Sequence, residues 1–214
     1  MTFPFPVFCP AIQTFPKVVS TATFVSSGNV SSANVSLPSS IVAGNLLLLF
    51  VGSTGSSVSV NTPSGFTQVV RALYPDASTG RQVYLFRKTA TGSEGATISV
   101  SQSTSTAMVS VSYQVSGWTA LQATGANGSD ANPDPPSLSP AWGTDNCLWL
   151  ATAIGRGAAF TAFPAGYWNV LNPTPTTNII IASAHLNKAS ASEDPGVFTQ
   201  NASDRWATIT TAVR

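Results

Sequence analysis

Short apolar or alternating runs, separated by clusters of glycine, proline, asparagine and serine, make up most of the chain. Runs of this kind that are rich in Val, Ile, Thr and aromatic residues predict β-strands. The predicted strands are residues 18–25, 32–37, 45–52, 67–73, 82–89, 96–101, 107–116, 147–154, 167–171, 178–186, 196–200 and 205–213. Residues 46–51 are apolar on both faces, as expected of a central strand. No window has the period of an amphipathic helix.

The second half of the chain repeats the order of features in the first. The matching segments are residues 44–50 and 145–151, 63–66 and 164–167, and 90–94 and 189–193. Each half then ends in a Ser/Thr cluster followed by an alternating strand. Repetition of this kind predicts two related structural halves. The spacing of 101 residues in the first two pairs makes Leu47 equivalent to Leu148 and Phe66 equivalent to Tyr167.

About 12 to 14 strands without helices predict an all-β fold, a jelly-roll-like or concanavalin-like β-sandwich, because each half-apolar sheet must be buried against another. The related halves are residues 17–118 and 126–214. The proline-rich segment 125–136 is predicted to be a loop or an edge crossing. Each half could form its own small sandwich, but the short linker and the uneven halves favour one fused unit.

Residues 1–16 form a separate N-terminal arm, in which prolines alternate with phenylalanines. Proline restricts the backbone of such a segment to extended or polyproline conformations. A row of exposed phenylalanines is costly, so the arm packs on its own sandwich or on a partner. Phe3, Phe5 and Phe8 are the candidate partner-binding residues. The arm lacks the basic and apolar regions of a signal peptide, and Met1 favours synthesis in the cytosol.

Charged residues make up 8% of the chain, against about 25% in an average soluble protein. The longest apolar run, residues 46–51, is far shorter than the ~20 residues that span a bilayer, so no membrane association is expected. Solubility must then come from Ser, Thr, Asn and Gln, as in adhesins and virion shells. The net charge is +1 and the largest basic cluster is the pair Arg87 and Lys88, which argues against nucleic-acid binding.

The sequence offers little catalytic chemistry, and we expect no enzyme, no cofactor and no metal site. His185 is the only histidine, and its position corresponds to Phe86 or Arg87 in the first half, so a structural role is favoured. Cys9 and Cys147 lack metal-ligand spacing, and Cys147 is predicted to be a small buried side chain. Most acidic residues flank Gly or Pro and are typical of turns.

Tryptophans are the best indication of a binding function. Trp149 and Trp206 lie within apolar strands and are predicted to be core residues. Trp118, Trp142 and Trp168 lie near Gly or Pro, where an exposed indole can stack on a sugar ring or fill a partner's pocket. The alternative is that these three tryptophans only cap the ends of a sandwich.

Several segments together resemble the β-domains of tailed-bacteriophage virion proteins, found on tail fibres and as head-decoration proteins. These segments are residues 37–38, 42–48, 63–66, 133–138 and 202–209. The resemblance implies a non-enzymatic structural protein of the virion, made in the host cytoplasm and bound to capsid or tail proteins. It also implies a homo-oligomer, such as a trimer. Head and tail locations both stay open. The alternative function is a carbohydrate-binding module that recognises a host glycan on a virion or cell surface.

Overall fold

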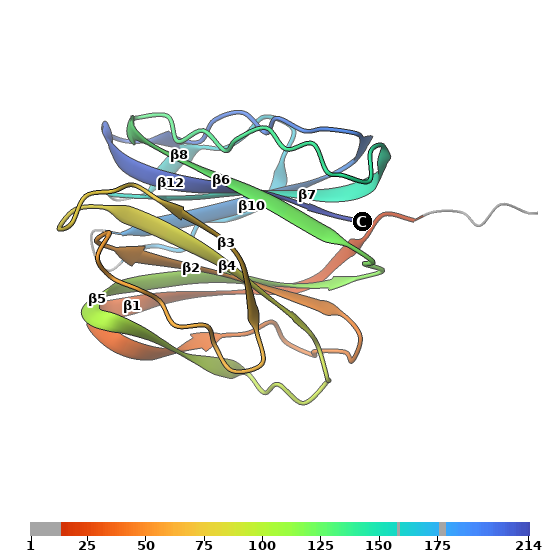
Figure 1. The fold of residues 1–214 in the computed structure, drawn as a ribbon, viewed down its shortest axis with the longest axis horizontal. Helices are drawn as coiled ribbons and strands as arrows, with labels where there is room; N and C mark the ends of the chain where they lie inside the picture. Colours follow the sequence, from red (N-terminus) through yellow and green to blue (C-terminus); the bar gives the residue numbers. More distant parts are fainter. Residues whose placement is uncertain (1–13, 158, 176–178) are drawn as a thin grey trace, which may run out of the picture.

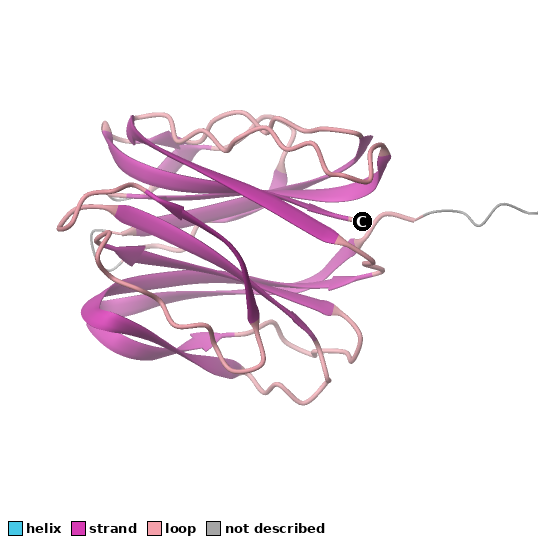
Figure 2. Ribbon diagram, in the orientation of Figure 1, coloured by secondary structure: helices cyan, strands magenta, loops and turns pink. Residues whose placement is uncertain are grey.

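The computed structural model describes residues 14–157, 159–175 and 179–214, and these residues form twelve β-strands and no helix (Figure 2). The strands are β1 (Lys17–Ser36), β2 (Leu46–Thr54), β3 (Thr67–Leu73), β4 (Arg81–Thr89), β5 (Thr97–Ser116), β6 (Leu121–Asp130), β7 (Asp145–Gly155), β8 (Phe160–Ala162), β9 (Trp168–Leu171), β10 (Ile180–Ser190), β11 (Thr199–Gln200) and β12 (Asp204–Val213). Two antiparallel sheets lie face to face, which confirms the predicted all-β sandwich (Figure 1).

Each half of the chain builds one five-stranded sheet, and the two sheets have the same strand order. The first sheet runs β1-β5-β2-β4-β3, and the second runs β6-β12-β7-β10-β9. Strand β6 therefore takes the place of β1, β7 that of β2, β9 that of β3, β10 that of β4 and β12 that of β5. The short strands β8 and β11 pair separately.

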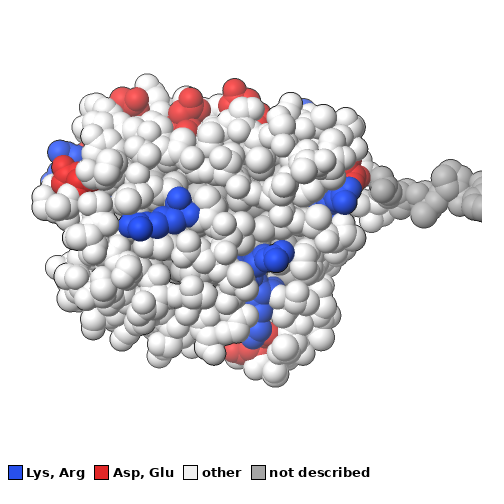
Figure 3. Space-filling model, viewed as in Figure 1, with Lys and Arg blue, Asp and Glu red and all other residues white. Residues whose placement is uncertain are grey.

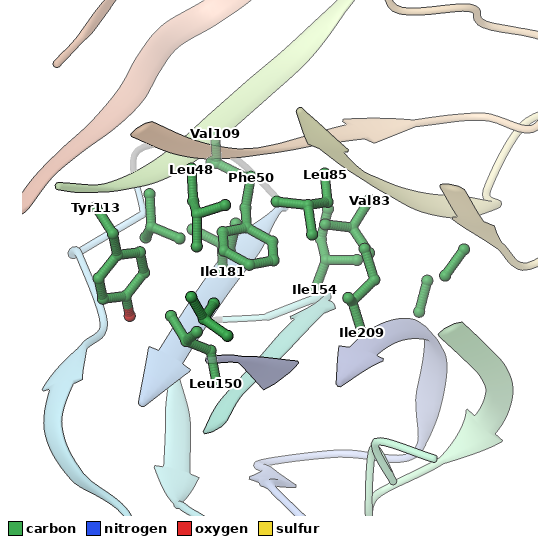
Figure 4. Close-up of a cluster of buried hydrophobic side chains, with 14 of the residues drawn as sticks. Leu48, Phe50, Val83, Leu85, Val109, Tyr113, Leu150, Ile154, Ile181 and Ile209 are labelled. Atoms are coloured by element: carbon green, nitrogen blue, oxygen red, sulfur yellow. The ribbon is translucent and has the colours of Figure 1, made fainter. Parts of the chain in front are cut away.

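The main hydrophobic core lies between the two sheets, where alternate residues of the central strands meet. Phe50 and Leu85 of the first sheet face Leu150, Ile154 and other side chains of the second (Figure 4). All four of these side chains are fully buried. Burial of a large apolar side chain contributes about 1.5–3 kcal/mol, so this shared layer is a major source of stability for both sheets.

Each sheet also has an apolar outer face, which long connecting segments cover. In the first sheet Leu47 and Leu49 pack outward beneath Phe66, and in the second Trp149 packs outward with Phe198. These outer clusters explain why the central strands are apolar on both faces.

Neutral polar side chains fasten the covering segments to the sheets. The hydroxyl of Thr210 in β12 donates to the carbonyl of Pro136 at 2.6 Å, and that of Thr208 donates to the carbonyl of Asp134 at 2.9 Å. In the first sheet the side-chain oxygen of Gln114 accepts from the backbone N–H of Val42 at 2.6 Å. Part of the Ser, Thr and Gln content therefore serves internal packing, in addition to the solubility expected from the sequence.

Turn contacts recur in the two halves. Lys88 forms an ion pair with Glu94 at 3.1 Å, and Lys188 forms one with Glu193 at 2.6 Å. In the turns at residues 63–66 and 164–167, the backbone N–H of the last residue donates to the carbonyl of the first, at 3.0 and 3.2 Å. These turns support the expected equivalence of Phe66 and Tyr167.

The expected equivalence of Leu47 and Leu148 is wrong by one residue. Leu47 packs in the outer cluster of the first sheet, whereas its neighbours Leu46 and Leu48 lie in the central core. Leu148 points instead into the central core. A shift of one residue exchanges the two faces of a strand, and sequence matching could not detect it where both faces are apolar.

Two pairs of predicted strands are continuous in the structure. Residues 18–25 and 32–37 join in β1, and residues 96–101 and 107–116 join in β5. The pairing of β1 with β5 shifts register after Val18, Val25 and Val30, so irregularities absorb the residues that the sequence pattern assigned to turns. The segment predicted as a loop or an edge crossing contributes to the edge strand β6. Within the described residues, no helix is both long and apolar enough to cross a membrane.

Candidate functional site: a groove between two sheet edges

The two edges of the sandwich differ. At one edge β3 and β6 are in close contact: a Cβ added to Gly125 of β6 would lie 2.7 Å from the Cβ of Ala72 in β3. This position needs glycine because any side chain would collide with the facing strand. No groove remains between β3 and β6 at that point.

At the other edge, a groove of about 530 Å³ separates β1 from β9; we call it the edge groove. Its lining is Lys17, Val18, Val19, Ser20, Thr21, Trp168, Asn169, Val170, Leu171, His185 and Asn187. Strand β9 has four residues where its counterpart β3 has seven. Asn172 and Pro173 follow it directly, and proline cannot donate to a ladder. The second sheet therefore ends in a shorter edge strand at β9 than the first sheet does at β3.

Trp168 dominates the wall of the edge groove. It pairs with His185 across β9 and β10, as Thr67 pairs with Arg87 across β3 and β4. Thr67 is also exposed, but Trp168, at 46% exposure, presents a large aromatic side chain at this position. Next to Trp168, Asn169 has a φ of 50°, a left-handed conformation that asparagine tolerates better than most residues. The irregular backbone at Asn169 interrupts the pairing of β9 with β10.

Further apolar side chains surround the same opening. Among the described residues, five large hydrophobic side chains are exposed, and Val19, Trp168 and Val170 of the edge groove are three of them. Val19 lies at a register shift of β1, between Val18 and Ser20. Among the described residues that line the groove, Lys17 is the only Lys, Arg, Asp or Glu. The groove is therefore mainly apolar and weakly charged, which suits an uncharged, partly apolar ligand.

His185 forms the floor of the groove and is 2% exposed. Its ring lies 4.4 Å from that of Trp168 and 6.3 Å from that of Tyr113, between ring centroids. Its Nδ1 has no hydrogen-bond partner among the described residues, and its Nε2 is 3.5 Å from Nδ2 of Asn169. Burial lowers the pKa of His185 below its usual value, so the ring is neutral at pH 7. Thr67, directly after Phe66, pairs with Arg87 in the first sheet as Trp168, directly after Tyr167, pairs with His185 in the second, which agrees with the expected match of His185 to Arg87.

Replacement of His185 by leucine should reduce the pH dependence of stability between pH 8 and pH 5. In the wild type, the unfolded chain takes up a proton below about pH 6.5 while the buried ring resists it, so stability falls as the pH falls. One such proton contributes at most about 1.4 kcal/mol per pH unit. Urea unfolding at several pH values measures the slope. An unchanged slope in His185→Leu would show that His185 is equally protonated in both states.

The five tryptophans separate into distinct roles. Trp149 and Trp206 are buried, as predicted. Trp118 is half-buried, and its indole N–H donates to the carbonyl of Gly44 at 3.0 Å. Trp142 is half-buried, with the guanidinium of Arg214 lying 5.1 Å from its ring centroid. Of the three candidate contact tryptophans, Trp168 alone is both exposed and in the edge groove.

Several acidic side chains serve as turn and edge anchors. Glu94 accepts hydrogen bonds from the backbone of Thr91 and Gly92, at 2.6 and 3.0 Å. Burial raises the pKa of Glu94, but bonds from Thr91 and Lys88 outweigh it and lower this pKa to about 2. Asp130 accepts from the indole of Trp206 at 3.0 Å. In the part of the chain that the structure describes, no three His, Cys, Asp or Glu residues gather as a metal site.

Sequence reasoning missed most of the edge groove. Val19, Val170 and Asn187 belong to ordinary strand patterns, and nothing in the sequence marks them as neighbours. The proline after the short strand β9 was the one available indication of an open edge. The candidate residues Phe3, Phe5 and Phe8, and also Cys9, lie outside the described residues.

Comparison with known proteins adds no relative: the chain matches no protein-family model, no curated protein and no solved structure.

Proposed function

We propose that the chain is a non-enzymatic structural protein of a tailed-phage virion, attached to the particle through protein–protein contacts at the edge groove. The observation that carries this proposal is the concentration of exposed apolar side chains, Val19, Trp168 and Val170, at one sheet edge. Exposed apolar side chains gathered at one place, with an aromatic anchor, are typical of interaction sites. The assignment to a virion rests on the resemblance of the sequence to phage β-domains.

The character of the surface supports the same role. Charged side chains are sparse on the face seen in Figure 3, and much of the surface is neutral. Neutral β-rich surfaces of this kind suit close packing among many copies of virion proteins. We expect the protein in the virion, made in the host cytoplasm, with capsid or tail proteins as partners.

Quantitative mass spectrometry of purified virions that encode this chain tests the proposal. The wild-type protein should be present, on the order of hundreds of copies for a head-decoration protein and far fewer for a tail protein. Particles from a Trp168→Ala, Val170→Ser mutant should carry clearly less of it. Val42→Ser, which changes an exposed valine outside the groove, is the control. Absence of the wild-type protein from the particle would contradict the proposal.

Glycan binding is the second candidate, and the exposure of Trp168 favours it specifically. An exposed indole beside Asn169, Asn187 and Lys17 combines a stacking surface with hydrogen-bond donors for sugar hydroxyls. Glycan-array binding that is lost in Trp168→Ala would support this candidate. An array without any binding by the wild type would retire it.

A further inference from the structure

We propose that the edge groove binds the N-terminal arm of a second copy of this chain, with Phe3 and Phe5 of that copy seated beside Trp168. The inference rests on the proposed role of the groove as a docking surface, and it names the occupant. Four observations support it: the apolar lining, the irregular strand edges, the length of the groove and the direction in which the chain leaves β1.

The chemistry of the arm matches that of the groove. Residues 1–16 contain no Asp, Glu, Lys or Arg, and Phe3, Phe5, Val7 and Phe8 are large and apolar. The groove offers Val19, Trp168 and Val170 as exposed apolar surface. An uncharged segment can enter it without desolvating an ion.

The irregular strands at the edges of the groove determine how an occupant can be held. Register shifts at Val19 in β1 and at Asn169 in β9 interrupt regular pairing. Such irregularities discourage the addition of a continuous strand. The occupant must therefore be held mainly by side-chain burial. A segment with prolines at positions 4, 6 and 10 meets this condition, because proline has no N–H to satisfy. Proline-rich segments commonly bind aromatic-lined grooves in this way.

The dimensions agree with five or six residues of the arm. The wall that β1 contributes, residues 17–21, is about 15 Å long at the usual rise of a strand. Residues 3–8 in a polyproline conformation would extend about 18 Å. Phe3 to Phe8 can therefore lie along the groove without looping out.

The direction in which the chain leaves β1 favours docking of the arm in the groove of a second copy over docking in the groove of the same chain. Residues 14–16 directly precede β1, and traced toward the N-terminus they lead away from the sandwich (Figure 1). Pro16 is held beside Gly117 at the end of β5: a Cβ added to that glycine would lie 4.0 Å from the Cα of Pro16. To reach the groove beside residues 17–21, the same chain would have to reverse against β1. The 13 residues before Thr14 reach about 40 Å when extended, enough to enter a neighbouring copy.

Full-chain variants with complementary defects test the proposal. The arm variant is Phe3→Ser, Phe5→Ser and Phe8→Ser, and it keeps the groove intact. The groove variant is Trp168→Ala and Val170→Ser, and it keeps the arm intact. The control is Val42→Ser and Val197→Ser, at exposed valines outside the groove. Molar mass is measured by light scattering over a range of concentrations, after circular dichroism shows that each variant is folded.

We expect the wild type and the control to self-associate. The arm variant and the groove variant should each associate at least about tenfold more weakly, as loss of buried aromatic anchors predicts. Mixing the two variants should restore association, because the arm of one meets the groove of the other. A wild type that stays monomeric, variants that associate normally, or a mixture without hetero-association would each overturn the proposal. The assay contains no particle, so its failure is separate from absence of the protein from virions.

Discussion

Replacement of Phe50 by alanine should destabilise the whole sandwich by about 3–5 kcal/mol, the usual range for removing a large buried aromatic side chain. Phe50 is fully buried in the central core, and its ring meets that of Tyr113 edge-on with centroids 6.2 Å apart. Leu150 and Ile154 of the opposite sheet belong to the same cluster. A cavity at Phe50 therefore weakens the packing of both sheets.

Differential scanning calorimetry of Phe50→Ala measures this effect. Because the two sheets share one core, the wild type should unfold in a single transition, and the variant should show one transition at a lower temperature. Val42→Ala, at a 55% exposed valine, is the control and should change the melting temperature little. Two transitions, of which the substitution shifts only one, would mean that each half of the chain is an independent folding unit.

Much of the fold could be predicted from the sequence because the signals involved are local. Short apolar or alternating runs located the central strands β2, β4, β7 and β12 to within a few residues. The residues that continue β1 and β5 through their irregularities were not predicted as strand. Ser, Asn and Gly at residues 26–31 are typical of turns, yet pairing with β5 keeps them in a strand. Non-local pairing overrides local preference there.

The register of the repeat could not be read from the apolar runs. Residues 46–51 are apolar at every position, so a shift of one residue leaves the pattern unchanged. Polar residues resolve the register in the structure. Gln102 bonds the carbonyls of Val30 and Thr106, and Gln200 bonds those of Asp130 and Asp204, so Thr106 of β5 matches Asp204 of β12. Sparse polar residues with defined partners are more informative for aligning such halves than the apolar residues between them.

The candidate site was predictable only in part, because it joins strands that are distant in sequence. Trp168 was a candidate from its type and its position near a glycine. The pairing of β1 with β5 and of β9 with β10 brings the two free edges to the same side of the sandwich, and this depends on the strand order of both sheets. Trp118 and Trp142 had similar sequence surroundings, yet both are half-buried. Exposure follows from tertiary packing, which the local sequence does not encode.

A pair of buried glutamines holds equivalent points in the two sheets. Nε2 of Gln102 donates to the carbonyls of Val30 and Thr106, at 2.6 and 2.8 Å. Nε2 of Gln200 donates to the carbonyls of Asp130 and Asp204, at 2.6 and 3.0 Å. Val30 pairs with Thr106 in the first sheet, and Asp130 pairs with Asp204 in the second. Each glutamine therefore links the two strands of an edge pair.

Replacement of either glutamine by leucine should lower the free energy of unfolding by about 1–3 kcal/mol, because two partly buried backbone carbonyls lose their donor. Gln102→Leu should cost more than Gln200→Leu, since Oε1 of Gln102 also accepts from the hydroxyl of Ser53 at 2.7 Å. By contrast, Oε1 of Gln200 has no partner among the described residues. Urea unfolding of both variants measures the two losses, with Gln68→Leu on an exposed position of β3 as the control. If Gln102→Leu were destabilising and Gln200→Leu neutral, the matching hydrogen bonds of the two glutamines would not make equivalent contributions to stability.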